Sequence, residues 1–148
     1  MPNVEYKFTR VKSEPPIPNS ERLKELGFII GKWEAKNAEG GSSSWTFKWS
    51  ADKNLIENEV VMCGPDGEVT YSSKGVLGWD ASNRQITNWT FDNQGSPAKF
   101  IWVKTGDRTW STWPTDGNWT ATVKTVDQDT WSVDWGAAKS EFKRQAEK

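Results

Sequence analysis

The sequence predicts an all-β protein, a single antiparallel meander that closes into a β-barrel of nine or ten strands preceded by one short helix. In many short segments large apolar residues alternate with small or polar ones, the period of two that half-buried strands show. Short turns rich in Gly, Asp, Asn and Pro separate these segments, so consecutive strands should be antiparallel neighbours. The length of 148 residues suits one domain with a substantial core.

The first part of the chain contains no strand pattern. Residues 1–19 are polar and interrupted by prolines, which predicts a flexible N-terminal arm ahead of a barrel domain over residues 20–148. A short helix is expected over residues 21–26, because Ser20 can serve as its N-cap and Gly27 can end it in the left-handed conformation.

Beyond the helix, each alternating segment predicts a strand. The expected strands are residues 31–37, 43–50, 54–63, 68–79, 84–91, 98–104, 108–113, 118–126 and 130–135. Residues 137–148 have a helical composition, yet Phe142 and Arg144 alternate with polar neighbours as a closing strand would, and we favour the strand. Closure buries the apolar face and removes exposed edges. A two-sheet sandwich is the alternative, and it needs a long crossover connection that the turn spacing lacks.

Every tryptophan except Trp113 falls on the face that the alternation assigns to the interior. The tryptophans expected to be mostly buried are Trp45, Trp49, Trp89, Trp102, Trp119, Trp131 and Trp135. The residues expected on the solvent face are Thr46, Lys48, Thr120, Thr122, Lys124 and Ser132. Trp113 precedes Pro114 at a turn and should lie off the common face. Inward rings either fill a barrel or line a pocket in it, whereas outward rings would stack on glycans or on bases.

Composition excludes several function classes. The net charge of −1, from 19 basic and 20 acidic residues, offers no broad cationic surface, so no nucleic-acid partner is expected. The chain has no histidine, which excludes Ser-His-Asp and Cys-His catalysis and the usual zinc sites, and we expect neither metal nor cofactor. Cys63 is the one cysteine, and neither an apolar leader nor an apolar run of membrane-spanning length is seen. These features predict a soluble, cytoplasmic protein, and they leave its oligomeric state open.

Two motifs resemble those of a known superfamily. Gly31-Lys32-Trp33, at the start of the first expected strand, resembles the G-x-W signature of the calycins, the lipocalin-like barrels. Residues 75–80, GVLGWD, with Ile86, Trp89, Phe91, Asp92 and Gly95, resemble a pattern of a group of small uncharacterised bacterial lipocalin-like proteins. The resemblance extends over residues 23–144. It implies a barrel with a central cavity, in a superfamily that binds retinoids, fatty acids, haem or other hydrophobic molecules. Haem in such proteins is held by histidine, so haem binding is not implied here.

The leading functional hypothesis is a barrel that binds a small hydrophobic or amphipathic molecule. The candidate binding residues are Trp45, Trp49, Asn58, Tyr71, Trp89, Trp102, Trp119, Trp131 and Arg144. Asn58 and Tyr71 could orient a hydroxyl or carbonyl of the ligand. Arg144 lies two residues after Phe142, so both side chains would point to the same face of a closing strand. Arg144 could then hold a carboxylate inside the barrel. The alternative is that Arg144 is a solvated basic residue near the C-terminus.

Two other function classes remain open from the sequence. The first is a cofactor-independent isomerase, lyase, cyclase or hydrolase that uses carboxylates and Tyr71 in place of histidine. Glu57 and Glu59 lie two residues apart, on one face of the expected strand, and the simplest interpretation is that this face is exposed to solvent. If that strand is turned the other way, they become paired carboxylates with raised pKa values inside the barrel. The second class is a fully plugged structural module whose N-terminal arm docks onto a partner.

Overall fold

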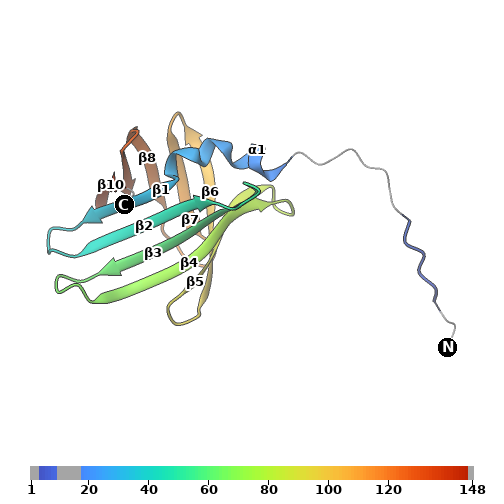
Figure 1. Cartoon of the computed structure of the whole chain (residues 1–148), viewed down its shortest axis with the longest axis horizontal. Coiled ribbons are helices and arrows are strands. Elements are labelled where there is room, and N and C mark those ends of the chain that lie inside the picture. Colours follow the sequence, from blue (N-terminus) through green and yellow to red (C-terminus); the bar gives the residue numbers. More distant parts are fainter. Residues whose placement is uncertain (1–3, 10–17, 147–148) are drawn as a thin grey trace.

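The computed structural model of the chain describes residues 4–9 and 18–146 (Figure 1). A short helix α1, Asn19–Leu23, continues as a 3₁₀ helix η1, Lys24–Ile29. The strands that follow are β1 Gly31–Lys36, β2 Ser42–Trp49, β3 Ile56–Cys63, β4 Val69–Asp80, β5 Gln85–Asp92, β6 Pro97–Gly106, β7 Thr109–Pro114, β8 Ala121–Asp127, β9 Thr130–Asp134 and β10 Lys139–Arg144. The predicted all-β fold with one short helical segment is confirmed.

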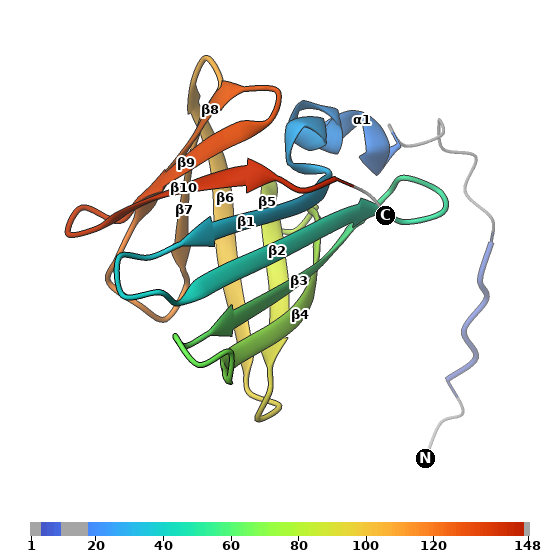
Figure 2. The same cartoon turned by 60° about the vertical axis from the view of Figure 1, so that its left-hand side comes forward.

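The strands form one closed antiparallel barrel (Figure 2). Each strand pairs with the next along the chain, and β10 pairs with β1 to close the sheet. The closure rests on Trp33 opposite Arg144 and Glu34 opposite Lys143. The C-terminal segment is therefore a strand, as favoured, and the sandwich alternative is wrong. Closure satisfies the backbone groups that a tenth strand would otherwise leave at an edge.

The helical segment is longer than expected. It begins at Asn19 with Pro18 in the N-cap position, and it runs through Gly27 to Ile29 as a 3₁₀ helix. The Ser20 side chain makes no capping hydrogen bond. Its backbone N–H donates to Asn54 Oδ1 at 3.1 Å. The 3₁₀ geometry has a physical reason, because three residues per turn stack Leu23, Leu26 and Ile29 on one face. All three side chains are fully buried.

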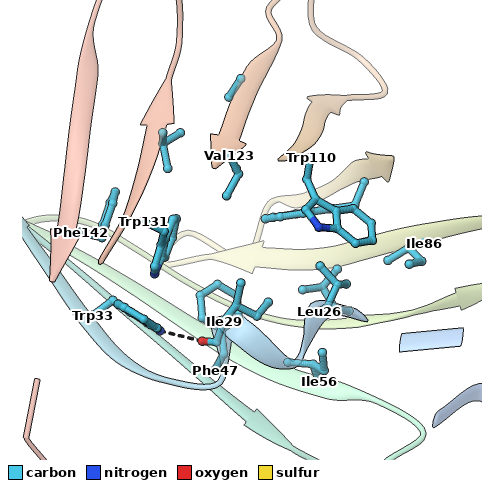
Figure 3. Packing of buried hydrophobic residues seen from close by; sticks show 14 of the residues in the cluster. Leu26, Ile29, Trp33, Phe47, Ile56, Ile86, Trp110, Val123, Trp131 and Phe142 are labelled. Atoms are coloured by element: carbon cyan, nitrogen blue, oxygen red, sulfur yellow. Dashed lines mark hydrogen bonds between the residues drawn. The ribbon is translucent and has the colours of Figure 1, made fainter. Parts of the chain in front are cut away.

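This face packs against buried side chains of the strands (Figure 3), at the end of the barrel where the helical segment lies (Figure 2). The buried cluster that it joins contains Ile56, Leu77, Ile86 and Trp110, one residue each from β3, β4, β5 and β7. Polar contacts at the surface add to the apolar packing. The Arg22 guanidinium lies 4.4 Å from the ring centroid of Trp79, and Lys104 of β6 pairs with Glu25 at 3.0 Å.

Arg144 and Trp33 join the last strand to the helical segment. Trp33 Nε1 donates to the Ile29 carbonyl at 2.7 Å, as drawn in Figure 3. The Arg144 guanidinium lies 4.2 Å from the Trp33 ring centroid, and its Nη1 donates to the Ile30 carbonyl at 2.7 Å. Its other nitrogens donate to the Gln128 carbonyl and to the Asp129 carboxylate. Arg144 thereby holds β10, the β8–β9 turn and the helical segment together.

The glycines of residues 75–80 allow neighbouring strands to approach closely. A Cβ added at Gly75 would lie 2.5 Å from the Trp89 carbonyl oxygen, and one at Gly78 would lie 2.9 Å from Leu55 Cδ2. Asp80 ends the motif by accepting the backbone N–H of Ser82 at 3.0 Å in the β4–β5 turn. The motif is thus explained by packing and turn geometry.

The N-terminal arm predicted over residues 1–19 lies mostly outside the described residues. Within it, residues 4–9 form neither helix nor strand and expose Val4, Tyr6 and Phe8. The domain boundary at residue 20 stays a prediction. In the part of the chain that the structure describes, no helix has the length and apolar character to cross a membrane.

Candidate functional site

The barrel interior is divided into a filled half and a hollow half. The filled half is an aromatic plug, defined here as Trp33, Trp45, Phe47, Trp131 and Phe142. Trp131 lies at its centre, stacked on Phe142 with ring centroids 4.6 Å apart and edge-on to Trp45 at 5.4 Å. Trp131 and Trp33 are essentially inaccessible to solvent. Some tryptophans therefore form the core and others line a pocket, at different heights in the same barrel.

The hollow half is a cavity of about 330 Å³. This volume is near the lower end of the range of about 300 to 1,000 Å³ typical of small-molecule sites. Its polar lining residues are Asn58, Tyr71, Ser73, Asn88, Thr90 and Thr112. Its apolar lining residues are Trp45, Phe47, Val60, Met62, Phe100, Trp102, Trp119, Ala121, Val123, Val133 and Trp135. No charged side chain of the described residues lines it, so the cavity is apolar with a few polar groups. A fully plugged barrel is thereby excluded.

The cavity reaches the surface at the end opposite the helical segment, at a mouth marked by Tyr71 and Trp119. These side chains are 36% and 41% exposed. Trp119 was expected to be buried in a strand, and this expectation is wrong, because β8 begins only at Ala121 and Trp119 belongs to the β7–β8 connection. Its ring lies beside that of Phe100, with the ring planes tilted by 44° and the centroids 6.0 Å apart.

The floor of the cavity is polar. Asn58, Asn88 and Thr112 each follow a residue of the buried cluster by two positions, after Ile56, Ile86 and Trp110 respectively, and so point inward one step nearer the mouth. We call these three residues the polar floor. Asn58 Nδ2 donates to Asn88 Oδ1 at 2.8 Å across β4. Asn58 Oδ1 and Thr112 Oγ1 are buried and have no hydrogen-bond partner among the described residues.

The cavity brings together some of the predicted binding residues and not others. Trp45, Asn58, Tyr71, Trp102 and Trp119 line it. The remaining four, Trp49, Trp89, Trp131 and Arg144, do not.

Three of these four lie elsewhere along the barrel. Trp49 is half-buried opposite Ile56 near the closed end, and Trp131 is the centre of the plug. Arg144 also lies at the closed end, where its guanidinium is bound by Ile30, Gln128 and Asp129. Parity along β10 did predict that Arg144 shares a face with Phe142, but parity carries no information about which end of the barrel a residue occupies.

The fourth, Trp89, was assigned to the wrong face. Asn88 and Thr90 line the cavity, so Trp89 between them points outward, where it is half-buried. Hydrophobicity alone would turn Trp89 and Phe91 inward. The pairing register instead places Asn88 beside Leu77 and Phe100 on the inner face, which leaves Phe91 58% exposed.

The remaining burial expectations are met unevenly. Trp102 and Trp131 are buried as expected, whereas Trp45, Trp49 and Trp135 are half-buried. Lys48, Thr120, Thr122 and Lys124 are exposed as expected, Thr46 is half-buried, and Trp113 lies on the outer face as the predicted exception. Ser132 was expected to face solvent but is buried. It pairs with Lys124 of β8 and Glu141 of β10, so it is a short side chain between two longer ones.

No carboxylate of the described residues lines the cavity. Glu57 and Glu59 are exposed on the outer face, where Glu57 pairs with Lys48 at 3.6 Å, so the solvent-face interpretation is correct. They line a separate hollow of about 370 Å³ on the outside of β2, β3 and β4. Tyr71 is then the only titratable side chain of the described residues that lines the barrel cavity.

The titratable groups with shifted pKa values lie on the outer surface of the barrel and in its turns. A hydrogen bond from the Asn54 backbone lowers the pKa of Asp52, and one from the Asn83 side chain lowers the pKa of Asp80. A hydrogen bond to Glu141 raises the pKa of Lys143. Within residues 4–9 and 18–146, no group of three Cys, Asp or Glu side chains is arranged to hold a metal ion.

Sequence reasoning missed Asn88, Thr90 and Thr112. A signal was present for the first two, because Ile86, Asn88 and Thr90 share a parity opposite to that of Trp89 and Phe91. For Thr112 the signal was that it lies two residues after Trp110 and therefore on the same face of its strand.

Comparison of the chain with known protein families and with curated proteins gives no match in either case. The closed antiparallel barrel is consistent with a calycin-like fold.

Proposed function

We propose that this protein binds a small hydrophobic or amphipathic molecule inside its barrel. The observation that carries the proposal is the cavity of about 330 Å³, whose walls are mainly aromatic and aliphatic and whose polar groups are few and uncharged. This combination is what small-molecule sites in proteins generally have. A barrel required only for stability would gain from filling this space with side chains, because a close-packed interior has more favourable contacts.

The resemblance of Gly31-Lys32-Trp33 and of residues 75–80 to calycin motifs supports the same proposal, since that superfamily consists largely of binding proteins. The enzymatic alternative has less support. Its acid and base were to come from carboxylates inside the barrel, and Glu57 and Glu59 lie outside it. Tyr71 by itself, at the mouth, supplies no acid and base pair.

The test is a titration with N-phenyl-1-naphthylamine, an uncharged probe whose fluorescence rises in an apolar site. We expect saturable binding of one probe per chain. The variant Ala121→Phe should abolish it, because Ala121 is buried in the cavity wall opposite Thr112 and a phenyl ring there occupies the space. The matched control is Thr122→Phe, which places the same ring on the outer face one residue later.

A loss of affinity of tenfold or more in Ala121→Phe, with unchanged affinity in Thr122→Phe, would support binding inside the barrel. Equal affinity in both variants would place the probe on the surface and contradict the proposal. The proposal also fails if the folded wild-type protein binds neither this probe nor any of a set of terpenoid alcohols, fatty acids and aromatic acids. Circular dichroism of each variant provides the check on folding.

A further inference from the structure

The polar floor has a composition that selects among ligands. Asn58, on β3, and Thr112, on β7, are only 6% and 8% exposed. Each faces the interior immediately beyond the apolar residues that close the barrel, so a molecule that fills the cavity reaches both. The question is which chemical group these side chains would accept.

The Asn58–Asn88 pair exists because β4 has no side chain between them. Gly75 lies opposite Asn58 in the β3–β4 pairing, and a Cβ at that position would come 3.2 Å from Asn58 Oδ1 and 2.7 Å from Thr90 Cγ2. The gap lets Asn58 Nδ2 reach Asn88 Oδ1 at 2.8 Å. One hydrogen bond thus fixes the Asn58 amide with its nitrogen engaged and its carbonyl oxygen free.

Two hydrogen-bonding atoms of the floor are left unused by the protein. Asn58 Oδ1 can only accept a hydrogen bond, and Thr112 Oγ1 can donate or accept. Neither has a partner among the described residues. Leaving a buried polar atom unpaired is unfavourable, whereas an apolar residue of the same shape would carry no such penalty. Stability alone therefore does not explain these two unpaired atoms in the cavity lining, and a bound ligand would supply the partner that each lacks.

The orientation of β5 supports this reading independently. The strand turns Asn88 and Thr90 toward the cavity and leaves Trp89 and Phe91 outside, with Phe91 58% exposed. For burial alone the opposite orientation would be better, because it would place two aromatic rings in the interior. Departures of this kind from local preference are expected where a site has a function.

Among the described residues, none that lines the cavity carries a charge that would neutralise a charged ligand. Its lining in the described structure holds no Lys or Arg side chain, and the Arg144 guanidinium is engaged at the closed end by Ile30, Gln128 and Asp129. Moving a carboxylate into such a space costs its hydration without an ion pair in return. Fatty acids and aromatic acids in their ionised form are thus poorly matched to this site.

We propose, on the basis of the binding function above, that the ligand is an uncharged apolar molecule with a hydroxyl group, an alcohol or a phenol, that enters with this group first. Its hydroxyl hydrogen is donated to Asn58 Oδ1 at the polar floor, and Thr112 provides the second polar contact. Its apolar body lies against Trp102 and Val123, toward the mouth at Trp119.

Four naphthalenes of nearly equal size test the proposal by displacement of N-phenyl-1-naphthylamine from the wild-type protein: 2-naphthol, 2-methoxynaphthalene, naphthalene and 2-naphthoate. We expect 2-naphthol to bind about tenfold more tightly than the ether and the hydrocarbon, which is the effect of about one buried hydrogen bond. The naphthoate should bind more weakly than all three at neutral pH. Equal affinities for naphthol and its ether, or strongest binding by the naphthoate, would overturn the inference and leave the binding function intact. Failure of the probe, of all four naphthalenes and of the terpenoid alcohols, fatty acids and aromatic acids named above to bind would overturn both.

Substitutions in the cavity test which protein atoms bind the hydroxyl group of the ligand. Asn58→Leu should abolish the preference for naphthol over the ether. Because this variant also removes the bond to Asn88, Thr112→Val provides a second test that alters only an unpaired hydroxyl. It should reduce the preference for naphthol about threefold or more. Its matched control is Thr122→Val, the same change on the outer face of β8. If Asn58→Leu and Thr112→Val both fold and both keep the full preference for naphthol over its ether, the polar floor is not where the hydroxyl group binds.

Discussion

Substitution of two tryptophans by alanine distinguishes the hollow half of the barrel from the filled half. Trp102 and Trp131 are both buried, 5% and 0% exposed. Trp102 lies in the cavity wall. Trp131 is enclosed by the plug, with Phe142 stacked at 4.6 Å and the rings of Trp45 and Trp33 at 5.4 and 5.6 Å. The two variants should therefore differ in both stability and binding.

The expected magnitudes follow from what each ring touches. Removal of a tightly packed large aromatic costs about 3 to 5 kcal/mol. Trp131→Ala should lie in this range, since the loss of aromatic contacts outweighs the small gain from removing its unpaired Nε1. Trp102 has the cavity on one side and fewer packing contacts, so Trp102→Ala should cost less stability, about 2 kcal/mol. At about 2 to 4 °C per kcal/mol for a chain of this size, the midpoints should fall by about 6 to 20 °C for Trp131→Ala and about 4 to 8 °C for Trp102→Ala.

The assays are urea denaturation for the free energy of unfolding, thermal unfolding followed by circular dichroism for the midpoint temperature, and titration with N-phenyl-1-naphthylamine for binding. Trp102→Ala should weaken probe binding about tenfold or more, whereas Trp131→Ala should change it by less than about threefold while the protein stays folded. The variant Trp131→Phe is the control for the plug, because it keeps a ring on Phe142 and should restore most of the stability. Equal losses of stability from the two alanine variants would show that Trp102 is packed on both sides in solution. The division of the interior would then be wrong.

Three further substitutions test particular contacts. Gly75→Ala should destabilise the fold by about 1 to 3 kcal/mol, measured by urea denaturation, since the new methyl group meets the Trp89 carbonyl oxygen; an unchanged midpoint would show that β4 and β5 can separate freely there. Thr112→Val should leave the stability of the empty protein unchanged or raise it by up to about 1 kcal/mol, because the hydroxyl has no partner in the described structure; a clear loss of stability would indicate a hydrogen bond in the folded protein. Arg144→Met should cost about 2 kcal/mol through lost contacts with Trp33 and the Ile30 carbonyl, with unchanged probe affinity; weakened binding would return Arg144 to the site.

Much of the fold was predictable because it depends on local pattern. The period of two across residues 31–135 and the turn residues between the segments predicted the strands to within a few residues, with β8 three residues later than expected. The spacing of Leu23 and Leu26 likewise predicted a helical segment, although this segment continues through Gly27 to Ile29 instead of ending at Gly27. The barrel itself followed from the short connections and from the need to pair both edge strands.

The candidate site was predicted only in part, because parity assigns a residue to a face and not to a height along the barrel. Trp102 and Trp131 have the same pattern in the sequence, yet one lines the cavity and the other fills the plug. Arg144 shares a face with Phe142 but is separated from the cavity by the plug. The length of the helical segment and the stagger of the strands decide these heights, and both arise from contacts between residues distant in the chain.

The face of β5 was also decided by tertiary structure. Its two sides are Asn88 with Thr90 and Trp89 with Phe91, and local hydrophobicity favours burial of the aromatic side. The pairing of Asn88 with Leu77 of β4 and Phe100 of β6 reverses this preference. The sequence by itself determined that this chain forms a closed barrel with an aromatic interior. Which side chains meet in the cavity depends on the register of all the strands together, because one residue of shift exchanges the inner and outer faces.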